Sequence, residues 1–310
     1  MTAGDQGIIL HQYDISPYVR KVKIALAIKG LGWRGCTQPV IAPKPDLVAL
    51  TGGYRRIPVL QIGADIYCDS DLIIRELDRR FPETPLGCDG PNAMLFALSP
   101  WFGALLTQTA VPIIFSDGRT VDPAFAKDRE QVMGGPYVDI TGWTAAAPHA
   151  AESFRAQLDW IDRTLAEGRP WLSGDAPGLL DIFAYPNLGF VREMRIDTAP
   201  IDRLDRVTAW EERIEALPEG RLADISTSEA VEVARAATPS TEGRVSADEP
   251  AELKAGDRVV VSAVDYGRDP VEGVLVSSSA QHVTIRRTDE RAGEVNVHFP
   301  RFGFRVERRG

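Results

Sequence analysis

The first eighty residues alternate strand-like and helix-like patterns in an order that few folds accommodate. Short apolar or β-branched runs indicate strands, and apolar side chains at helical spacing indicate helices. Two β-rich runs joined by Gly63-Ala64-Asp65 give a hairpin signal, and hairpin strands must be antiparallel. The sequence therefore predicts a β-α-β-α-β-β-α unit with a mixed sheet. In chain order, its segments are a strand at 7–11, a helix at 18–28, a strand at 33–40, a short helix or turn at 44–53, two strands within 57–68 and a helix at 70–81.

The pattern changes twice after this unit. Helical patterns dominate residues 87–237 and strand-like runs are lacking there, although residues 116–148, rich in Gly and Pro, are expected to be irregular in part. Residues 238–252 are polar and predict a flexible linker. Residues 253–310 consist of short alternating runs separated by Gly, Asp and Pro, which predicts a small closed barrel of five strands. We therefore expect an α/β domain at 1–86, an all-helical domain at 87–237 and a small all-β domain at 253–310.

Charge and cysteine content argue against several classes of function. The formal charge is −9, and the middle of the chain, residues 87–250, is its acidic part, which disfavours nucleic acid or an anionic membrane as main partner. We find no run of eighteen apolar residues that would span a membrane, and the polar N-terminus argues against a secretory signal. The three cysteines, Cys36, Cys68 and Cys88, form no C-x-x-C motif or metal knuckle. Such an odd, sparse set suits a reducing cytoplasm.

A serine followed directly by proline stands where the first strand gives way to the first helix. Ser is a favoured N-cap residue and Pro fits the first helical position, so Ser16-Pro17 marks a helix start. The free backbone N–H groups and the helix dipole at such a position favour an anion, including a thiolate. The pair is therefore either a plain cap or part of an anion site.

Three segments resemble the glutathione transferase family. They are SPYVRKVKIAL, YRRIPVL and YCDSDLIIREL, and they occur in the family's order, followed by a helical region of suitable length. The resemblance covers residues 7 to about 235 and does not extend to the C-terminal β region. It implies a thioredoxin-like domain that binds glutathione as co-substrate, an all-helical second domain, and assembly as a homodimer. The four histidines show no metal-ligand spacing, so no metal is expected.

The resemblance also implies which residues hold glutathione. Ile57-Pro58 is expected to be a cis peptide whose backbone N–H and C=O at Ile57 face the ligand, although a Pro opening an edge strand reads the same locally. Asp69-Ser70, at the start of a helix, suits the ammonium and carboxylate of the γ-glutamyl end. Lys44 is placed near the glycyl carboxylate, with Arg55 or Arg56 as alternatives that the sequence does not separate.

In this family context, Ser16 becomes the expected activator of the thiol. A free thiol has a pKa above physiological pH, and a hydroxyl that donates to the sulfur stabilises the thiolate. Tyr13 is the competing activator, because other branches of the family use a Tyr near the end of the first strand. A Cys in place of Ser16 would indicate thiol–disulfide chemistry; with Ser, transfer of glutathione is preferred over reductase activity.

The pocket for an electrophile is expected to come from apolar residues that face Ser16. Tyr18, Trp101, Phe102 and Tyr185 are candidates, although aromatic residues at helical spacing are commonly core residues. SGDAPGLLDIFAYP resembles the family's folding motif, with Asp181 in place but Gly178 where a Ser or Thr normally caps the helix.

The sequence is compatible with two functions. The first is an enzyme that conjugates glutathione to a hydrophobic electrophile, with lyase or dehalogenase chemistry as close variants. The second is a non-catalytic binding or scaffold protein that keeps the fold while its C-terminal β domain recruits a partner.

Overall fold

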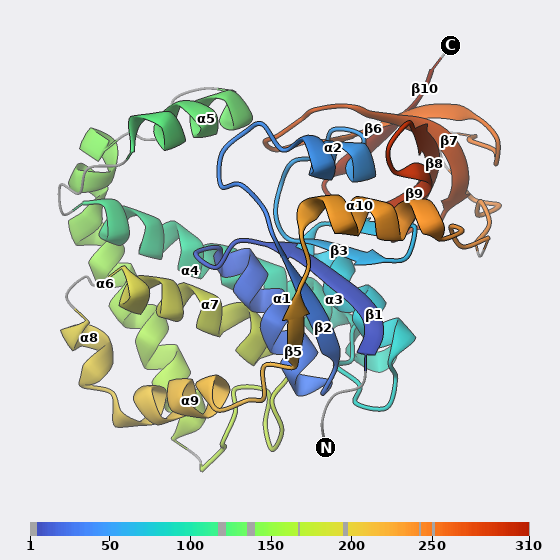
Figure 1. Cartoon of the computed structure of the whole chain (residues 1–310). Helices are drawn as coiled ribbons and strands as arrows, with labels where there is room; N and C mark the ends of the chain where they lie inside the picture. Colours follow the sequence, from blue (N-terminus) through green and yellow to red (C-terminus); the bar gives the residue numbers. More distant parts are fainter. Residues whose placement is uncertain are drawn as a thin grey trace.

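The computed structural model describes residues 5–116, 122–134, 140–166, 168–194, 198–241, 243–249 and 252–309. The predicted β-α-β-α-β-β-α order of the first unit is confirmed. Its strands pair in the order β4-β3-β1-β2, with β1 parallel to β2 and antiparallel to β3. Figure 1 shows α1 and α3 on one face of this sheet and α2 on the other. The elements are β1 (Asp5–Gln12), α1 (Pro17–Ile28), β2 (Gly32–Thr37), α2 (Pro45–Thr51), β3 (Val59–Ile62), β4 (Asp65–Cys68) and α3 (Ser70–Arg80).

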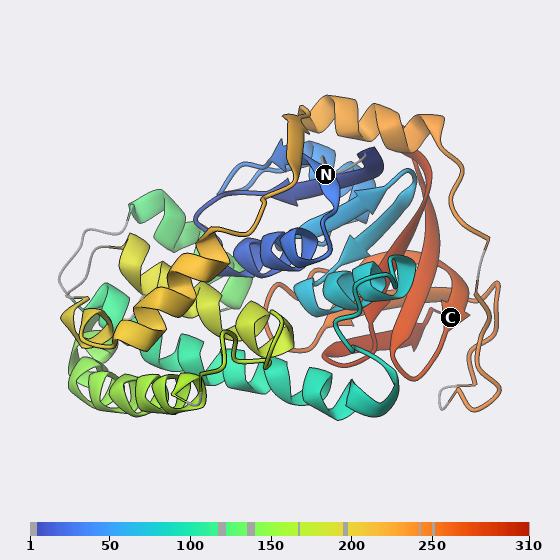
Figure 2. The ribbon, with the colours of Figure 1, turned by 90° about the horizontal axis from the view of Figure 1, so that it is seen from below.

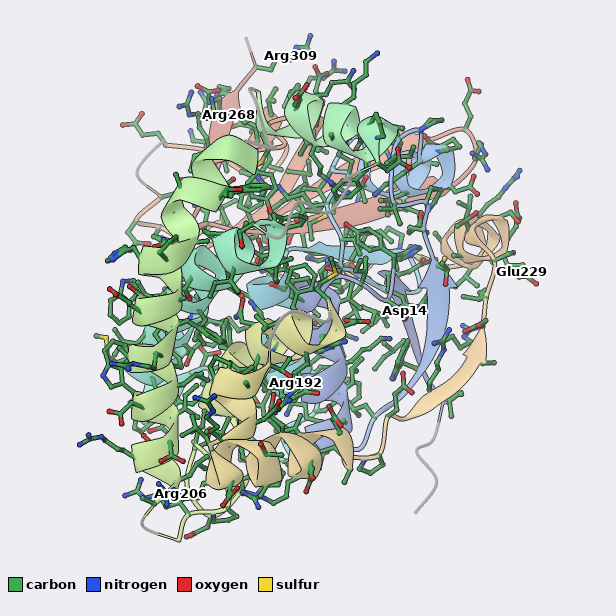
Figure 3. The ribbon with its side chains drawn as sticks, turned by 90° about the vertical axis from the view of Figure 1, so that its left-hand side faces the viewer. Asp14, Arg192, Arg206, Glu229, Arg268 and Arg309 are labelled. Carbon is green, nitrogen blue, oxygen red and sulfur yellow. The ribbon has the colours of Figure 1, made fainter. Side chains whose placement is uncertain are left out.

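The second unit is a cluster of helices packed on α1. Helix α7 contacts α1 directly, and α4 packs against α6 and α7 (Figure 2). Arg192 binds Glu211 and Asp202 and so joins α7, α8 and α9, on the side of the molecule seen in Figure 3. The described part of 116–148, expected to be irregular in part, is mainly helical. The elements are η1 (Gly90–Asn92), α4 (Ala93–Phe115), α5 (Pro123–Met133), α6 (Ile140–Leu165), α7 (Leu179–Glu193), α8 (Ala199–Asp202) and α9 (Asp205–Glu215).

Helix α4 carries an exposed apolar stripe. Met94, Leu98 and Trp101 are 69%, 52% and 62% exposed and follow one another at helical spacing. By length and composition alone, Gly90–Phe115 is apolar enough to cross a membrane, in contrast to the sequence-based expectation. One such helix is weak evidence of a span, and in this fold α4 packs on α6 and α7.

One strand lies in the segment expected to be entirely helical. The strand β5 (Arg221–Asp224) pairs in parallel with β2 at the edge of the sheet, and α10 (Thr227–Ala236) returns over α2. Four residues are too few for an alternating pattern to stand out in the sequence. The pairing exists because the edge of β2 offers backbone groups that another strand satisfies.

The five predicted C-terminal strands are confirmed, but their pairing differs from a closed barrel. The β-rich unit has the order β10-β6-β7-β8-β9, and β9 pairs in parallel with β4 through Asp65–Asn296, Ile66–Val297 and Tyr67–His298. Among the described pairings, the outer edge of β9 therefore joins the first sheet and does not close on β10. The result is one ten-stranded sheet, because each unit would otherwise expose an edge strand. The strands are β6 (Arg258–Ala263), β7 (Val271–Ser278), β8 (His282–Asp289), β9 (Gly293–Pro300) and β10 (Phe304–Arg308).

The described residues of the predicted flexible linker are tied to the sheet. Val245 forms a parallel bridge with Ser278 of β7, and Ser240 N–H donates to Asp65. Gly243 has a φ of 110°, and a Cβ there would approach Ser277 to 2.7 Å. These contacts make this segment part of the packed structure, which a polar composition alone does not reveal.

Candidate functional site

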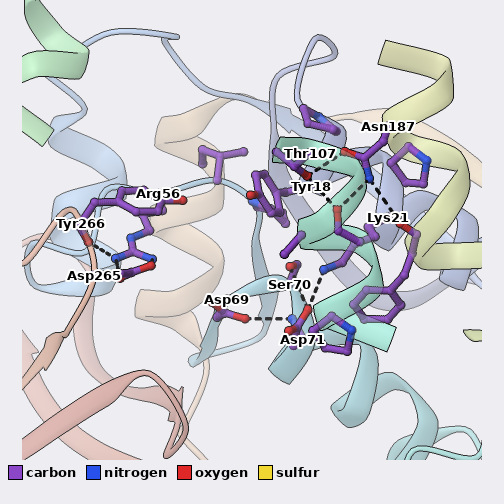
Figure 4. A pocket seen from close by; sticks show the side chains of 18 of the residues that line it. Tyr18, Lys21, Arg56, Asp69, Ser70, Asp71, Thr107, Asn187, Asp265 and Tyr266 are labelled. Atoms are coloured by element: carbon purple, nitrogen blue, oxygen red, sulfur yellow. Dashed lines mark hydrogen bonds and ion pairs between the residues drawn. The ribbon is translucent and has the colours of Figure 1, made fainter. Parts of the chain in front are cut away.

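A cavity of about 180 Å³ lies where the three units meet (Figure 4). The first unit lines it at the N-termini of α1 and α3 and around Pro58, the second unit from α4 and α7, and the third from the loop between β6 and β7. The lining residues are Pro17, Tyr18, Lys21, Tyr54, Arg56, Ile57, Pro58, Asp69, Ser70, Asp71, Pro100, Gly103, Ala104, Thr107, Phe183, Pro186, Asn187, Asp265 and Tyr266.

Ser16 caps α1 at one side of this cavity. Its Oγ accepts the backbone N–H of Val19 at 3.3 Å, so the hydroxyl proton remains available for a second partner. Ser16 is only 6% exposed and stands directly before Pro17 and Tyr18, which line the cavity. Tyr13 is partly buried, with Lys44 Nζ 5.3 Å from its ring centroid. Neither Ser16 nor Tyr13 is among the residues that line the cavity.

Ile57 and Pro58 both line the cavity, and the peptide bond between them is cis as expected. The segment leads directly into β3, the strand next to β1. Ile57 thus stands at the cavity wall, two residues before the first residue of β3.

The start of α3 gathers three polar side chains at the cavity. Asp69 adopts a φ of 82° and caps the helix by accepting the N–H of Asp71 at 2.9 Å. Lys21, from α1, binds the Asp71 carboxylate at 2.6 Å, and its Nζ lies 4.1 Å from the ring centroid of Phe183. Burial, reinforced by the Asp71 carboxylate, raises the pKa of Asp69 to about 6. The expected Asp69-Ser70 pair is therefore at the site, together with Lys21 and Asp71.

The three candidate cations of the first unit have different surroundings. Lys44 is buried outside the lining, its Nζ donates to Arg55 C=O at 3.4 Å, and burial lowers its pKa to about 8. Arg55 binds Asp128 of α5 at 2.6 Å. Arg56 lines the cavity, where it binds Asp265 of the third unit.

Of the four predicted pocket aromatics, the structure brings one to the cavity. Tyr18 lines it, whereas Trp101 is 62% exposed and Phe102 packs against the core. Tyr185 is buried, donates to Glu215 at 2.6 Å and packs edge-on against Trp210. On the same two helices, the residues that line the cavity are Pro100, Gly103, Ala104, Thr107, Phe183, Pro186 and Asn187.

Several residues that line the cavity were not predicted from the sequence. Lys21 follows Pro17 by four residues, so the helical period alone could have placed it on the same face of α1. Thr107 and Asn187 are joined by a 2.7 Å hydrogen bond between α4 and α7, which no local pattern signals. Asp265 and Tyr266 lie more than 200 residues after Arg56 and reach the cavity only through the tertiary fold.

A second cavity of about 400 Å³ lies between α3 and the third unit. His282 and His298 line it, their ring nitrogens are 3.1 Å apart, and His298 Nε2 is 2.9 Å from Asp65. Burial, and next the neighbouring His298, lower the pKa of His282 to about 3. The residues that the structure describes contain no cluster of three metal-ligating side chains, here or elsewhere.

A thioredoxin-like sheet, a helical domain packed on α1 and a cavity at the N-termini of α1 and α3 define the class of protein. The family model of the glutathione S-transferase N-terminal domain matches residues 10–85, and that of the C-terminal domain matches residues 143–213. The chain belongs to the glutathione S-transferase family.

One solved structure extends the likeness to the whole chain. A GST-like protein from Pseudomonas syringae is 34% identical, with a TM-score of 0.80, and the match covers 97% of this chain and 100% of that one. The likeness therefore includes the C-terminal β unit.

Curated relatives match part of the chain. Glutathione S-transferase U4 of Arabidopsis thaliana is 21% identical over 215 residues, which are 68% of this chain and 85% of that protein. Maleylacetoacetate isomerase of Pseudomonas aeruginosa is 26% identical over 185 residues, which are 58% of this chain and 79% of that protein.

Proposed function

We propose that this protein is a glutathione transferase that activates the thiol of glutathione and conjugates it to a hydrophobic electrophile. The observation that carries the proposal is the convergence of Ile57-Pro58 and Asp69-Ser70 on one cavity beside the N-terminus of α1. The backbone of Ile57 pairs with the peptide of glutathione, and the start of α3 holds its γ-glutamyl end.

Ser16 then acts on the sulfur. With its lone pair engaged by Val19 N–H, the hydroxyl donates its proton in a hydrogen bond to the thiolate, which lowers the pKa of the thiol. The thiol proton passes to water, the sulfur attacks the electrophilic carbon, and a C–S bond forms as the leaving group departs or the adduct gains a proton. Lys44, near the glycyl end, supplies a cation for that carboxylate in this proposal.

Transfer is favoured over thiol–disulfide chemistry by the state of the cysteines. All three are buried and unpaired, and burial raises the pKa of each thiol. Cys68, the cysteine nearest to Asp69, is buried at the end of β4. A reactive thiolate at the site therefore has to come from glutathione.

The test is binding followed by turnover. Isothermal titration calorimetry measures the affinity of the full chain for reduced glutathione. The rate of conjugation is then measured with an activated chloroaromatic compound as the electrophile. Saturable binding with turnover supports the enzyme. Binding without turnover of any electrophile supports the alternative, a glutathione-binding scaffold. Absence of binding contradicts both.

The proposal includes assembly as a homodimer in the cytoplasm. The exposed apolar stripe of α4, defined by Met94, Leu98 and Trp101, is a surface that a second copy would cover. Three free cysteines suit a reducing compartment. Light scattering of the purified chain tests the dimer, and replacing Leu98 by Glu should yield monomers.

A further inference from the structure

The loop between β6 and β7 brings the third unit into the cavity. Asp265 and Tyr266 line it, and both contact Arg56 of the first unit (Figure 4). The Arg56 guanidinium binds the Asp265 carboxylate through both terminal nitrogens, at 2.5 and 3.3 Å, and also donates to the backbone C=O of Tyr266. Its central carbon lies 3.8 Å from the centroid of the Tyr266 ring, a cation–π contact.

The loop is also fixed from the helical side. Gly267 N–H donates to Val132 C=O of α5 at 2.7 Å, and Gly267 adopts a φ of 53°. A Cβ at Gly267 would lie 3.2 Å from Arg56 Nε, so this glycine allows the close approach of the guanidinium. With Arg56 on one side and α5 on the other, the loop is held in place before any ligand arrives.

These contacts pair the charge of Arg56 with groups of the protein itself. Both terminal nitrogens bind the loop, and Nε is buried without a hydrogen-bond partner among the described residues. Arg56 is thus poorly placed to receive a ligand carboxylate. The Asp265 side chain, by contrast, remains 55% exposed at the cavity and has accepting capacity left.

Tyr266 lies within electrostatic reach of both Asp265 and Asp69. Burial, together with the carboxylates of Asp265 and Asp69, raises the pKa of Tyr266 against the opposing charge of Arg56. A cationic group bound beside Tyr266 would therefore have carboxylates from the first and third units within electrostatic reach.

We propose that Asp265 and Tyr266 are glutathione-binding residues supplied by the C-terminal β unit, that Asp265 receives the ligand's ammonium group, and that Arg56 is a positioning residue which holds them. This inference rests on the proposed function. It makes the third unit a wall of the active site in the same chain.

Calorimetry on the full chain with reduced glutathione tests the inference. Asp265→Asn should weaken binding at least about tenfold, because a charge-assisted hydrogen bond is lost, and Tyr266→Ala about fivefold. Asp269→Asn, the same change at an exposed position further along the loop, is the matched control and should stay within about twofold of the parent. Tyr266→Leu keeps the bulk should the alanine variant fail to fold.

The ammonium contact has its own test. N-acetyl-glutathione lacks the charge, so the parent should bind it more weakly than glutathione. Asp265→Asn should reduce this difference between the two ligands at least about threefold. Equal discrimination by both proteins overturns the assignment of Asp265.

Arg56→Lys keeps the charge but cannot make the bidentate contact and the carbonyl contact together. It should raise KM for glutathione about fivefold and leave KM for the electrophile unchanged, a split that a general loss of stability would not produce. If the parent binds glutathione and all four variants at Asp265, Tyr266 and Arg56 bind it equally well, the inference fails and the proposed function stands. If the parent itself does not bind, both fail.

Discussion

His298 of β9 lies with its Nε2 2.9 Å from Oδ1 of Asp65 on β4, across the seam between the first sheet and the C-terminal unit. Both residues are buried, at 6% and 7% exposure. Asn296 Nδ2 donates to the same carboxylate at 3.0 Å, and Ser240 N–H donates to its other oxygen at 2.9 Å. Asp65 thus receives donors from β9 and from the preceding segment, and it joins the two parts of the ten-stranded sheet.

We expect Asp65→Ala to destabilise the protein by about 3 kcal/mol, because the donors that face it are left buried without an acceptor. Urea unfolding at pH 7 measures the change. Asp269→Asn, at an exposed carboxylate of the third unit, should leave the midpoint unchanged. An Asp65→Ala midpoint equal to that of the parent would show that the seam does not depend on this carboxylate.

The same residue should make the seam sensitive to acid. Burial opposes ionisation of Asp65, but the hydrogen bonds from His298, Ser240 and Asn296 outweigh it and hold its pKa below the usual value. The native state therefore binds fewer protons at this site than the unfolded chain, so this stabilisation is present above about pH 4 and is lost as the pH falls through the lowered pKa. The free energy of unfolding of Asp65→Asn, measured between pH 3 and 6, should lack this pH-dependent contribution.

Ser16→Ala should lower kcat/KM for conjugation by about a hundredfold while glutathione still binds. The reason is that the hydroxyl acts on the sulfur, and the peptide contacts lie elsewhere. Tyr13→Phe is the matched change at the rival hydroxyl and should have a small effect. The pKa of bound glutathione, followed by thiolate absorbance, should rise in Ser16→Ala. Loss of activity in Tyr13→Phe alone would assign the role to Tyr13.

Glutathione affinity should fall about tenfold between pH 7 and pH 5. Asp69, whose pKa burial raises to about 6, shares the ammonium of the γ-glutamyl end with Asp265 and must be a carboxylate to do so. It becomes protonated in this range. For stability the sign is opposite to that at Asp65: the native state holds more protons at Asp69, so its contribution decreases as the pH rises from about 4 to 6. Calorimetry across the range should show a flat profile for Asp69→Asn.

Lys21 should set the pH at which glutathione binding weakens. Its ammonium binds Asp71 and lowers the pKa of Asp69, so Lys21→Met should move the midpoint of glutathione binding to higher pH. Lys23→Met, on the same helix but bound to Asp14, is the control and should leave the midpoint in place. Equal midpoints in both variants would contradict the coupling between Lys21 and Asp69.

The folding motif of the helical domain should depend on Ser173. Gly178 has no cap hydroxyl, but Ser173 Oγ accepts the N–H of Leu180 at 3.2 Å in its place. Ser173→Ala should therefore cost about 1 kcal/mol of stability. Gly178→Ser alone should not stabilise the protein either, because a Cβ at position 178 would lie 2.9 Å from the Ser173 side chain. Thermal unfolding of the two single variants and of Ser173→Gly/Gly178→Ser tests this, since only the double variant has room for the family's usual cap.

Asp181 of the same motif is expected to be far less tolerant. Its buried carboxylate accepts the N–H groups of Leu172, Ser173 and Gly178 and the indole N–H of Trp210. Asp181→Ala should therefore destabilise the helical domain by about 3 to 5 kcal/mol, because three buried donors and one partly buried donor lose their acceptor. Recovery of folded protein with an unchanged melting temperature would be incompatible with this role.

Periodicity and local chemistry determined the first unit and the motifs at the cavity. Short apolar or β-branched runs placed its strands, the Ser16-Pro17 cap marked α1, and the resemblance carried by Ile57-Pro58 and Asp69-Ser70 located one end of the site. These features depend on residues close in sequence, so the sequence alone reveals them. The five C-terminal strands were predictable for the same reason.

Only the tertiary structure decided how the third unit joins the rest. The pairing of β9 with β4, the seam at Asp65 and His298, and the contact of Arg56 with Asp265 connect residues about 200 or more positions apart. An edge strand offers its backbone groups to any strand of suitable geometry, and an alternating pattern does not indicate which strand will pair with it. The sequence therefore determined a glutathione transferase scaffold followed by a β unit, and the fold decided that this unit lines the same cavity.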